Sequence, residues 1–270
     1  YGRIICAALP FFMLQNVFQS FFVTAEKPKL GLFVTIGAGV ANMVLDALFI
    51  AVFGWGLAGA AAATGISQLV GGVVPLLYFT RKNDSLLRLG KTSFYGKVLW
   101  KTATNGSSEL MSSASASIVT TLFNFQVLKF AGEDGIAAYG VLMYVSFVFA
   151  AISIGYAVGA SPVVSYHFGA GNKAELKNLF KKSLLLVGAA GVLMFLLGQL
   201  LAVPLSALFA GYDKGLYDLT VRAFRLFAFS FLFSGLNIFG SAFFTALNNG
   251  WISALLSFSR TLVFQLAGVL

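Results

Sequence analysis

Two carboxylates, Glu109 and Asp46, lie inside long apolar stretches and are the residues with the clearest chemical potential. A charged side chain at the centre of a bilayer costs at least about 2.5–3.5 kcal/mol on insertion scales, so its presence there needs a reason. A carboxylate shielded from bulk water can take up and release a proton in the physiological range, or bind Na⁺. We therefore predict that Glu109 and Asp46 couple to H⁺ or Na⁺.

Glu109 shares one predicted helical stripe with small polar residues. Spacings of three and four place Asn105, Ser108, Ser112 and Ser115 on or near its face. Hydroxyl and amide groups beside a carboxylate could complete a cation site or contact a substrate, so we place Asn105, Ser108 and Ser112 in a substrate cavity. The alternative is a helix-packing stripe of small residues with one glutamate that reaches the interface.

Asp46 lies near the middle of an apolar stretch, four residues after Asn42, so the two side chains share a helix face. The pair could bind a cation or a substrate, and we place Asn42 in the cavity. The alternative for Asp46 is a simple pairing with a neighbouring helix.

Other polar side chains in apolar stretches are candidates for the same cavity. Gln15, Asn16 and Gln19 line one side of the first stretch. Interhelical hydrogen bonds, worth about 0.6 kcal/mol each, are the alternative explanation and the favoured one. We nevertheless include Gln15 and Gln19 in the predicted cavity, together with Tyr139 and Asn237. Tyr144 and Tyr156 are further candidates for its lining.

Enzyme and cofactor chemistry have little support in the sequence. The chain has one histidine, His167, and one cysteine, Cys6, which is too few for a His-based triad or a zinc site. It has no GxxxxGK[ST] phosphate loop, so ATP is not its direct energy source. We expect no enzyme activity, no metal and no cofactor other than H⁺ or Na⁺ as coupling ion.

The composition indicates a membrane protein built from helices. The chain is 59% hydrophobic and only 10% charged, whereas soluble domains carry about 25% charged residues. Runs of about 20 apolar residues are long enough to cross a bilayer as helices. The net charge of +9 is better explained by basic cytoplasmic loops than by nucleic acid. We expect membrane lipids and small organic molecules as partners, and a monomer.

Hydropathy predicts eight spans separated by short charged connectors. Lysine and arginine concentrate in loops 24–31, 80–101 and 168–182, which the positive-inside rule places in the cytoplasm. The polar segment 81–97 is predicted to link residues 1–80, the end of one lobe, to residues 98–270, a second lobe. The predicted spans are 2–24, 31–53, 57–79, 98–130, 136–168, 183–210, 218–247 and 250–270.

An internal repeat relates the first and seventh predicted spans. Asn, Phe, Ser, Phe, Thr and Ala recur at the same offsets in residues 16–25 and 237–246. Spans six helices apart have the same orientation, which predicts two parallel six-helix halves, as in several transporters. Because the chain starts and stops within apolar runs, we expect a fragment that lacks three helices before Tyr1 and one after Leu270.

Three sequence segments resemble one transporter family. Residues 24–31 (TAEKPKLG), 41–46 (ANMVLD) and 155–172 (GYAVGASPVVSYHFGAGN) are similar to the fourth–fifth loop, fifth helix and eighth-helix exit of multidrug and toxic compound extrusion (MATE) proteins. The bacterial multidrug-efflux and DNA-damage-inducible branches are the most similar. The resemblance implies an all-α, polytopic bundle of which about eight of twelve transmembrane helices, the fourth to the eleventh, are present.

The resemblance also implies a function. It implies a secondary antiporter in the bacterial inner (plasma) membrane that exports drugs or other amphipathic or cationic molecules in exchange for H⁺ or Na⁺. Asp46 matches the acidic residue of the family's fifth helix, and Glu109 falls on its seventh helix. Unlike some members, span 218–247 has no acidic residue in its core. A lipid-linked oligosaccharide flippase of the same superfamily is the alternative, although few basic residues lie within the spans to hold a pyrophosphate.

Overall fold

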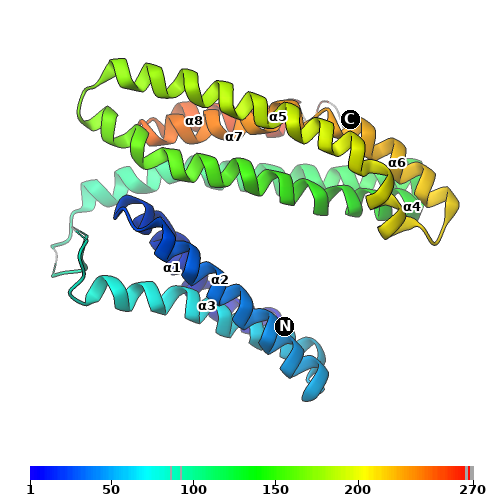
Figure 1. Ribbon diagram of the computed structural model, residues 1–270, viewed down its shortest axis with the longest axis horizontal. Coiled ribbons are helices and arrows are strands. Elements are labelled where there is room, and N and C mark those ends of the chain that lie inside the picture. Colours follow the sequence, from blue (N-terminus) through cyan, green and yellow to red (C-terminus); the bar gives the residue numbers. More distant parts are fainter. Residues whose placement is uncertain (86, 92, 265–266, 268–270) are drawn as a thin grey trace. The chain divides into compact units, whose positions relative to one another are not determined.

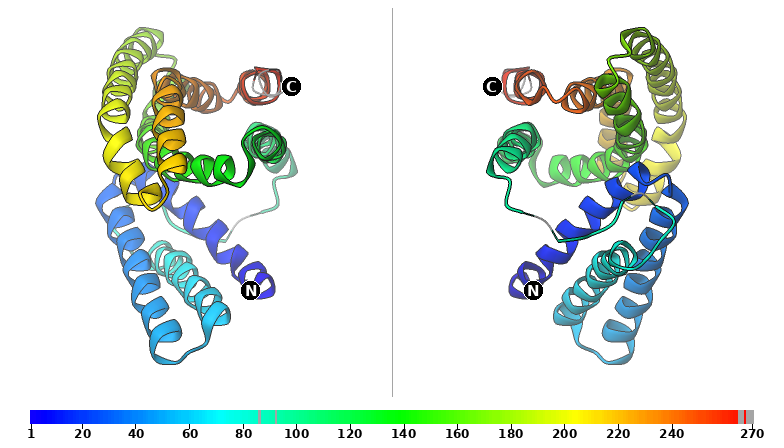
Figure 2. Two further views of the ribbon diagram at one scale, coloured as in Figure 1. Left: turned by 90° about the vertical axis from the view of Figure 1, so that its right-hand side faces the viewer. Right: turned by 90° about the vertical axis from the view of Figure 1, so that its left-hand side faces the viewer.

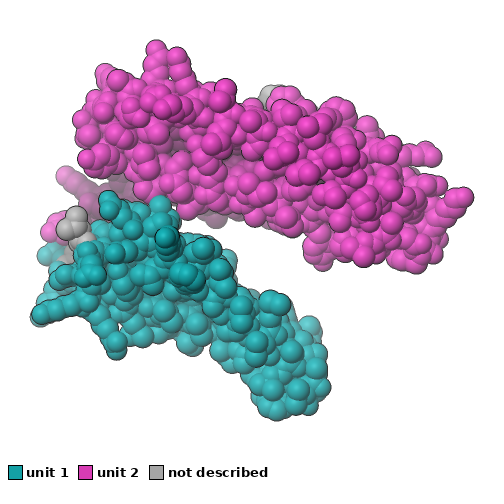
Figure 3. Space-filling view, in the orientation of Figure 1, with its two compact units in different colours: residues 1–94 teal, residues 95–270 magenta. Residues whose placement is uncertain are grey.

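The computed structural model describes residues 1–85, 87–91, 93–264 and 267, and the side chains of Ser108, Arg260, Leu262 and Phe264 lie outside this description. The protein is 88% helical, and its described residues form no strand (Figure 1). The chain divides into two compact units, residues 1–94 and 95–270, which are coloured separately in Figure 3. The predicted all-α membrane bundle is therefore confirmed.

Unit 1 is a bundle of three helices that run up, down and up. Helix α1 spans Gly2–Thr24, α2 spans Pro28–Asp46 and continues as the π-helix η1 at Ala47–Val52, and α3 spans Gly56–Thr80. Helix α3 packs along both α1 and α2. Its glycines permit this close approach, because a Cβ on Gly72 would lie 2.7 Å from the backbone oxygen of Phe11 on α1. One end of the bundle is filled by packed aromatic rings, in which Phe79 stacks on Phe18 and lies tilted against Phe22.

Unit 2 contains the longest helix and four shorter ones. Helix α4 spans Gly96–Gly169, α5 Lys173–Ala210, α6 Lys214–Ala228 and α7 Phe231–Ala246, and α8 spans Gly250–Phe258 and continues as the π-helix η2, Ser259–Phe264. The second half of α4 packs with α5, α6 and α7 around Leu142, Phe149, Phe224 and Phe231. Helix α8 lies against α4 and α7, as the side views in Figure 2 show.

Helix α4 is two antiparallel segments rather than one rod. At 74 residues it would extend about 110 Å if straight, which is several times the thickness of a bilayer core. Gly132 has φ 63° and ψ −156°, a conformation that is essentially restricted to glycine, and it turns the chain back. The rings of Phe123 and Tyr139, one on each side of the turn, lie 4.6 Å apart between centroids.

The helices account for the eight predicted spans. Five described helices are long and apolar enough to cross a membrane, and the α6–α7 pair, bent by 48°, makes a sixth. Dividing α4 at Gly132 adds another span, and α8 with η2 occupies the last predicted one. Two predicted spans differ from the structure by more than a shift of a few residues at their ends. Span 218–247 is bent, and α5 begins at Lys173 instead of 183, because the Asn172 side chain caps it by accepting from the Glu175 N–H.

The faces of the helices are divided between small buried residues and large exposed apolar ones. On α5, Gly191, Gly198 and Ala202 are buried against neighbouring helices, whereas Leu185 and Leu200 are 79% and 73% exposed. Small residues at helix contacts and apolar side chains directed outwards are the pattern of membrane bundles, in which lipid tails replace water at the surface. The exposed apolar surface is therefore consistent with a lipid-facing one.

The turns from α1 to α2 and from α7 to α8 share one backbone design. Each turn contains a non-glycine residue with positive φ, Glu26 at 59° in the first and Asn248 at 57° in the second. Each is closed by the same three backbone hydrogen bonds, from residues 25, 26 and 27 in the first turn and 247, 248 and 249 in the second. The sequence repeat aligns Thr24 with Thr245, whereas the hydrogen bonds of the turns align Ala25 with Leu247. The two alignments therefore differ by one residue.

Candidate functional site

The Asn42–Asp46 pair of unit 1 lies where α2 changes into a π-helix. Asp46 is the last residue of α2, and η1 begins at the next residue. Single-turn π segments within α-helices are frequent at functional sites. Asn42 lies one turn earlier on the same face, and both residues are half-buried. The predicted pairing of the two side chains on one face is therefore present in the helix geometry.

Three polar atoms of unit 1 are buried without a hydrogen-bond partner among the described residues. They are Asn42 Nδ2 and Asp46 Oδ1 on α2, and Gln68 Oε1 on α3. Helices α2 and α3 pack side by side and antiparallel, and Asn42 and Gln68 lie similar distances along the chain from Gly54 in the connecting turn. A buried polar group without a partner costs about 1–3 kcal/mol, so this concentration in one three-helix unit needs a reason.

The glutamines of α1 are engaged in helix packing. Gln15 lies against α3, because a Cβ on Gly71 would come within 2.6 Å of its Cδ. Gln19 donates from Nε2 to Thr35 Oγ1 over 3.3 Å and so links α1 to α2. Asn16 donates to the backbone oxygen of Phe12 in its own helix. Gln15 thus reaches α3 one turn from Gln68, whereas Gln19 and Asn16 have structural partners.

The stripe around Glu109 does not form one buried face. Ser115 is buried and Ser112 and Asn105 are half-buried, but Glu109 is exposed on the surface of α4. Asn105 Nδ2 donates to the backbone oxygen of Thr245 at the end of α7, 3.3 Å away. Ser108 lies on the same helix, but its side chain falls outside the described part. Glu109 therefore lies at the exposed edge of the stripe, next to the half-buried Asn105 and Ser112.

The remaining candidates of unit 2 are dispersed. Tyr139 packs inside the α4 hairpin, against Phe123 and with a hydrogen bond to Thr120. Tyr156 Oη donates a hydrogen bond to Ser183 Oγ on α5 over 2.8 Å, and the tyrosine ring contacts the Phe239 ring. Asn237 and Tyr144 are exposed. Within the described residues, no group of three His, Cys, Asp or Glu side chains could hold a metal ion.

Sequence reasoning missed Gln68. Nothing in the local pattern around it marks a functional position, since a single glutamine in an apolar helix is usually an interhelical hydrogen-bonding residue. Its significance arises from the packing of α3 in the three-helix unit, which buries Gln68 Oε1 without a described partner on a face of α3 whose neighbouring glycines, Gly71 and Gly72, contact α1.

Comparison with known proteins identifies the family. The MatE family model matches residues 110–268. Among curated proteins, the multidrug export protein MepA of Staphylococcus saprophyticus is 24% identical over 243 residues, covering 87% of this chain and 53% of that protein. MepA of Staphylococcus haemolyticus is 26% identical over 185 residues, covering 67% of this chain and 40% of its own length. The chain thus spans about half the length of these relatives.

Solved structures show the same fold. An outward-facing multidrug resistance MATE transporter of the MOP superfamily superposes with a TM-score of 0.94 at 21% identity, covering 100% of this chain and 60% of that one. A MOP superfamily transporter from Pyrococcus furiosus gives 0.83 at 22% identity, covering 90% and 55%. Since the family model covers more than half of the residues, the chain belongs to the MatE family of multidrug and toxic compound extrusion transporters.

Proposed function

We propose that the protein containing this chain is a secondary active exporter of drugs or other amphipathic or cationic organic molecules, driven by H⁺ or Na⁺. Family membership and the resemblance to multidrug export proteins support the transport class. The observation that carries the coupling role is the pair of buried polar atoms without described partners on α2, Asn42 Nδ2 and Asp46 Oδ1, which lie one helical turn apart.

Asp46 and Asn42 have the chemistry that ion coupling needs. A neutral Asp46 gains an O–H donor, whereas its ionised form offers only acceptors. Carboxylate and amide oxygens also suit hard cations. Proton or Na⁺ binding would therefore change both the charge and the hydrogen-bonding capacity of a buried helix pair. A gradient can drive transport when the affinity for the ion differs between inward- and outward-facing states.

Glu109 is the second coupling candidate and the weaker one. Its side chain is exposed on α4, so the environment within this unit gives it less differential affinity than the half-buried Asp46 has. We assign Asp46 the coupling role, with Asn42 as its immediate partner, and treat Glu109 as a residue that contacts substrate or the ion during transport.

The test uses the full-length protein reconstituted into vesicles. We expect Asp46→Asn to abolish ethidium accumulation driven by an H⁺ or Na⁺ gradient, while ethidium counterflow at equilibrium, which needs no coupling ion, is retained. Asp84→Asn, an exposed carboxylate of the same unit, is the matched control and should accumulate ethidium normally. Replacing Na⁺ by K⁺ then identifies the ion. Normal gradient-driven accumulation by Asp46→Asn would refute the coupling role.

A parallel experiment separates the two carboxylates. Glu109→Gln should retain gradient-driven accumulation with an altered KM for ethidium, because its role is assigned to contact with the substrate or ion. If Glu109→Gln abolishes gradient-driven accumulation and Asp46→Asn does not, coupling resides on α4 and the assignment is reversed. If the wild-type protein neither accumulates nor exchanges ethidium or any other organic cation, the export function itself is wrong.

A further inference from the structure

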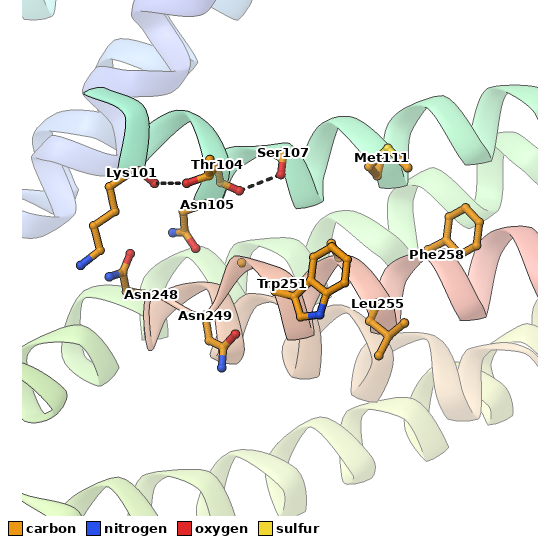
Figure 4. A pocket seen from close by; sticks show the side chains of 12 residues that line it. Lys101, Thr104, Asn105, Ser107, Met111, Asn248, Asn249, Trp251, Leu255 and Phe258 are labelled. Carbon is orange, nitrogen blue, oxygen red and sulfur yellow. Dashed lines mark hydrogen bonds between the residues drawn. The ribbon is translucent and has the colours of Figure 1, made fainter. Parts of the chain in front are cut away.

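A hollow of about 860 Å³ lies in unit 2 between the first half of α4 and the α7–α8 turn with α8. Its floor is a close helix contact, because a Cβ on Gly250 would lie 2.7 Å from Asn105 Cα. Figure 4 shows Lys101, Asn248 and Asn249 at one end of the hollow and Met111 and Phe258 at the other. The hollow is therefore amphipathic along its length.

The polar end is cationic. A second hollow of about 300 Å³ shares Lys101, Asn105 and Asn248 with the first and adds Lys97. Two ammonium groups thus flank the same region, and the amides of Asn248 and Asn249 add neutral donors. The described residues lining the two hollows include no carboxylate. This end is complementary to a phosphate group and repels an organic cation.

The other end is apolar and open. Met111, Leu255 and Phe258 line it, and Trp251, which is 79% exposed, stands at its edge. Tryptophan is enriched where a membrane protein meets the headgroup region, because its ring is apolar and its N–H is polar. An acyl chain fits this part of the hollow, since it needs only van der Waals contact with such side chains.

The hollow lies at the lysine-rich end of unit 2. Asn105 bonds to the Thr245 oxygen and Ser165 Oγ donates to the Ala246 oxygen over 2.9 Å, so both ends of α4 meet the α7–α8 turn (Figure 1). The basic residues there are Lys97, Lys101, Lys173, Lys177, Lys181 and Lys182, with Glu175 near them and Glu109 two turns along α4 from Lys101. The opposite end is balanced, with Lys129, Lys214, Arg222 and Arg225 beside Glu133, Asp134, Asp213 and Asp218.

We propose that this hollow binds an anionic phospholipid. Its phosphate lies between Lys97 and Lys101, near the amides of Asn248 and Asn249, and an acyl chain runs along Met111 towards Phe258. The positive-inside rule places the lysine-rich end in the cytoplasm, where anionic lipids give the membrane surface its negative potential. An anionic phospholipid thus fits the hollow in three respects. Its phosphate matches the charge of the lysines, its acyl chain matches the apolar lining, and its headgroup lies at the same depth in the membrane as the lysine-rich end.

The experiment is native mass spectrometry of the full-length, detergent-purified protein titrated with phosphatidylglycerol or phosphatidylcholine. We expect preferential retention of phosphatidylglycerol, and a loss of affinity of about fivefold for each of Lys97→Gln and Lys101→Gln. The double variant Lys181→Gln/Lys182→Gln removes two charges from the same end, one more than either single hollow variant, but outside the hollow, and should lose much less affinity. Ala254→Trp should fill the hollow and displace phosphatidylglycerol without removing any charge.

Each contrary result overturns the site. Equal losses in the hollow variants and in the Lys181/Lys182 control would show diffuse attraction to the basic end. Equal retention of phosphatidylcholine would remove the role of charge, and complete competition by glycerol phosphate would show a headgroup site without an acyl channel. Unchanged binding in Ala254→Trp, with a wild-type melting temperature, would show that the hollow is not occupied by lipid.

Discussion

The amide nitrogen of Asn105 lies 3.3 Å from the backbone oxygen of Thr245, to which it donates a hydrogen bond across 140 positions of the chain. This contact holds the start of α4 against the α7–α8 turn. Gly250, the first residue of α8, packs onto the same asparagine. The position at which α8 enters the bundle therefore depends on the side chain of Asn105 and on the lack of a side chain at Gly250.

Gly250→Ala should destabilise this contact. The added Cβ would come within 2.7 Å of Asn105 Cα, and backbone cannot rotate away as a flexible side chain can. We expect a loss of about 1–3 kcal/mol, as for overpacked cores. The measurement is the melting temperature of the full-length protein in detergent. Gly240→Ala on α7, where a Cβ meets nothing within 4 Å, is the control and should not lower it.

The buried hydroxyls between α7 and α8 should contribute to stability. Ser253 is fully buried and its Oγ lies 2.8 Å from both Ser241 Oγ and Thr245 Oγ1. Ser253→Ala should cost about 0.6–1.7 kcal/mol, which lies between the average and the maximum found for interhelical hydrogen bonds in membranes. Reversible unfolding in a denaturing detergent would measure it. The exposed Ser117, bonded within its own helix, provides Ser117→Ala as a control, and equal losses in both variants would contradict a role for the cluster.

Unit 1 depends on close contact between α1 and α3. Gly72→Ala would press a methyl group against the backbone oxygen of Phe11, 2.7 Å away. We expect a loss of about 1–3 kcal/mol in unfolding free energy, read as a lower melting temperature. Gly37→Ala on α2 adds the same methyl where nothing lies within 4 Å and should be neutral. A neutral Gly72→Ala would show that α1 and α3 are further apart than described.

Gly132→Ala should strain the turn of α4. At φ 63° and ψ −156° a side chain is poorly tolerated, and such conformations cost about 1–3 kcal/mol for residues other than glycine. The melting temperature should fall, whereas Gly140→Ala in the regular helix nearby should leave it unchanged. If both variants melt like the wild type, the turn does not rely on this backbone conformation.

Hydropathy was sufficient to predict the number of spans, because a bilayer requires about 20 apolar residues per helix and the loops are visibly polar. The bend between α6 and α7 could not be predicted in this way. The charged residues of 218–247, Asp218, Arg222 and Arg225, all precede the bend, and no proline or glycine marks the 48° change in direction at Phe229 and Ser230.

The two acidic candidates show what spacing can and cannot predict. Asn42 and Asp46 are one helical turn apart, and both carry a buried atom without a described partner. On α4 the stripe is wider. At about 100° per residue, Glu109 lies about 40° to one side of Asn105 and Ser115 about 80° to the other. A face centred between Asn105 and Ser115 therefore buries the serine and leaves Glu109 exposed.

The hollow between α4 and α8 could not be found from sequence. Lys101 and Trp251 come from segments far apart in the chain, and neither belongs to a motif. Lysine at a loop boundary is explained by membrane orientation alone. Only the approach of α8 to α4 shows that an ammonium group and an apolar channel occupy one site.

The sharp reversal at Gly132 has a consequence for how the chain enters a membrane during synthesis. The two segments of α4 are joined at Gly132 with almost no intervening loop. We therefore expect both segments to insert into the bilayer at nearly the same time. Lys129, Glu133 and Asp134 at the apex must cross together with them. We therefore expect this region to insert into the membrane as a single hairpin.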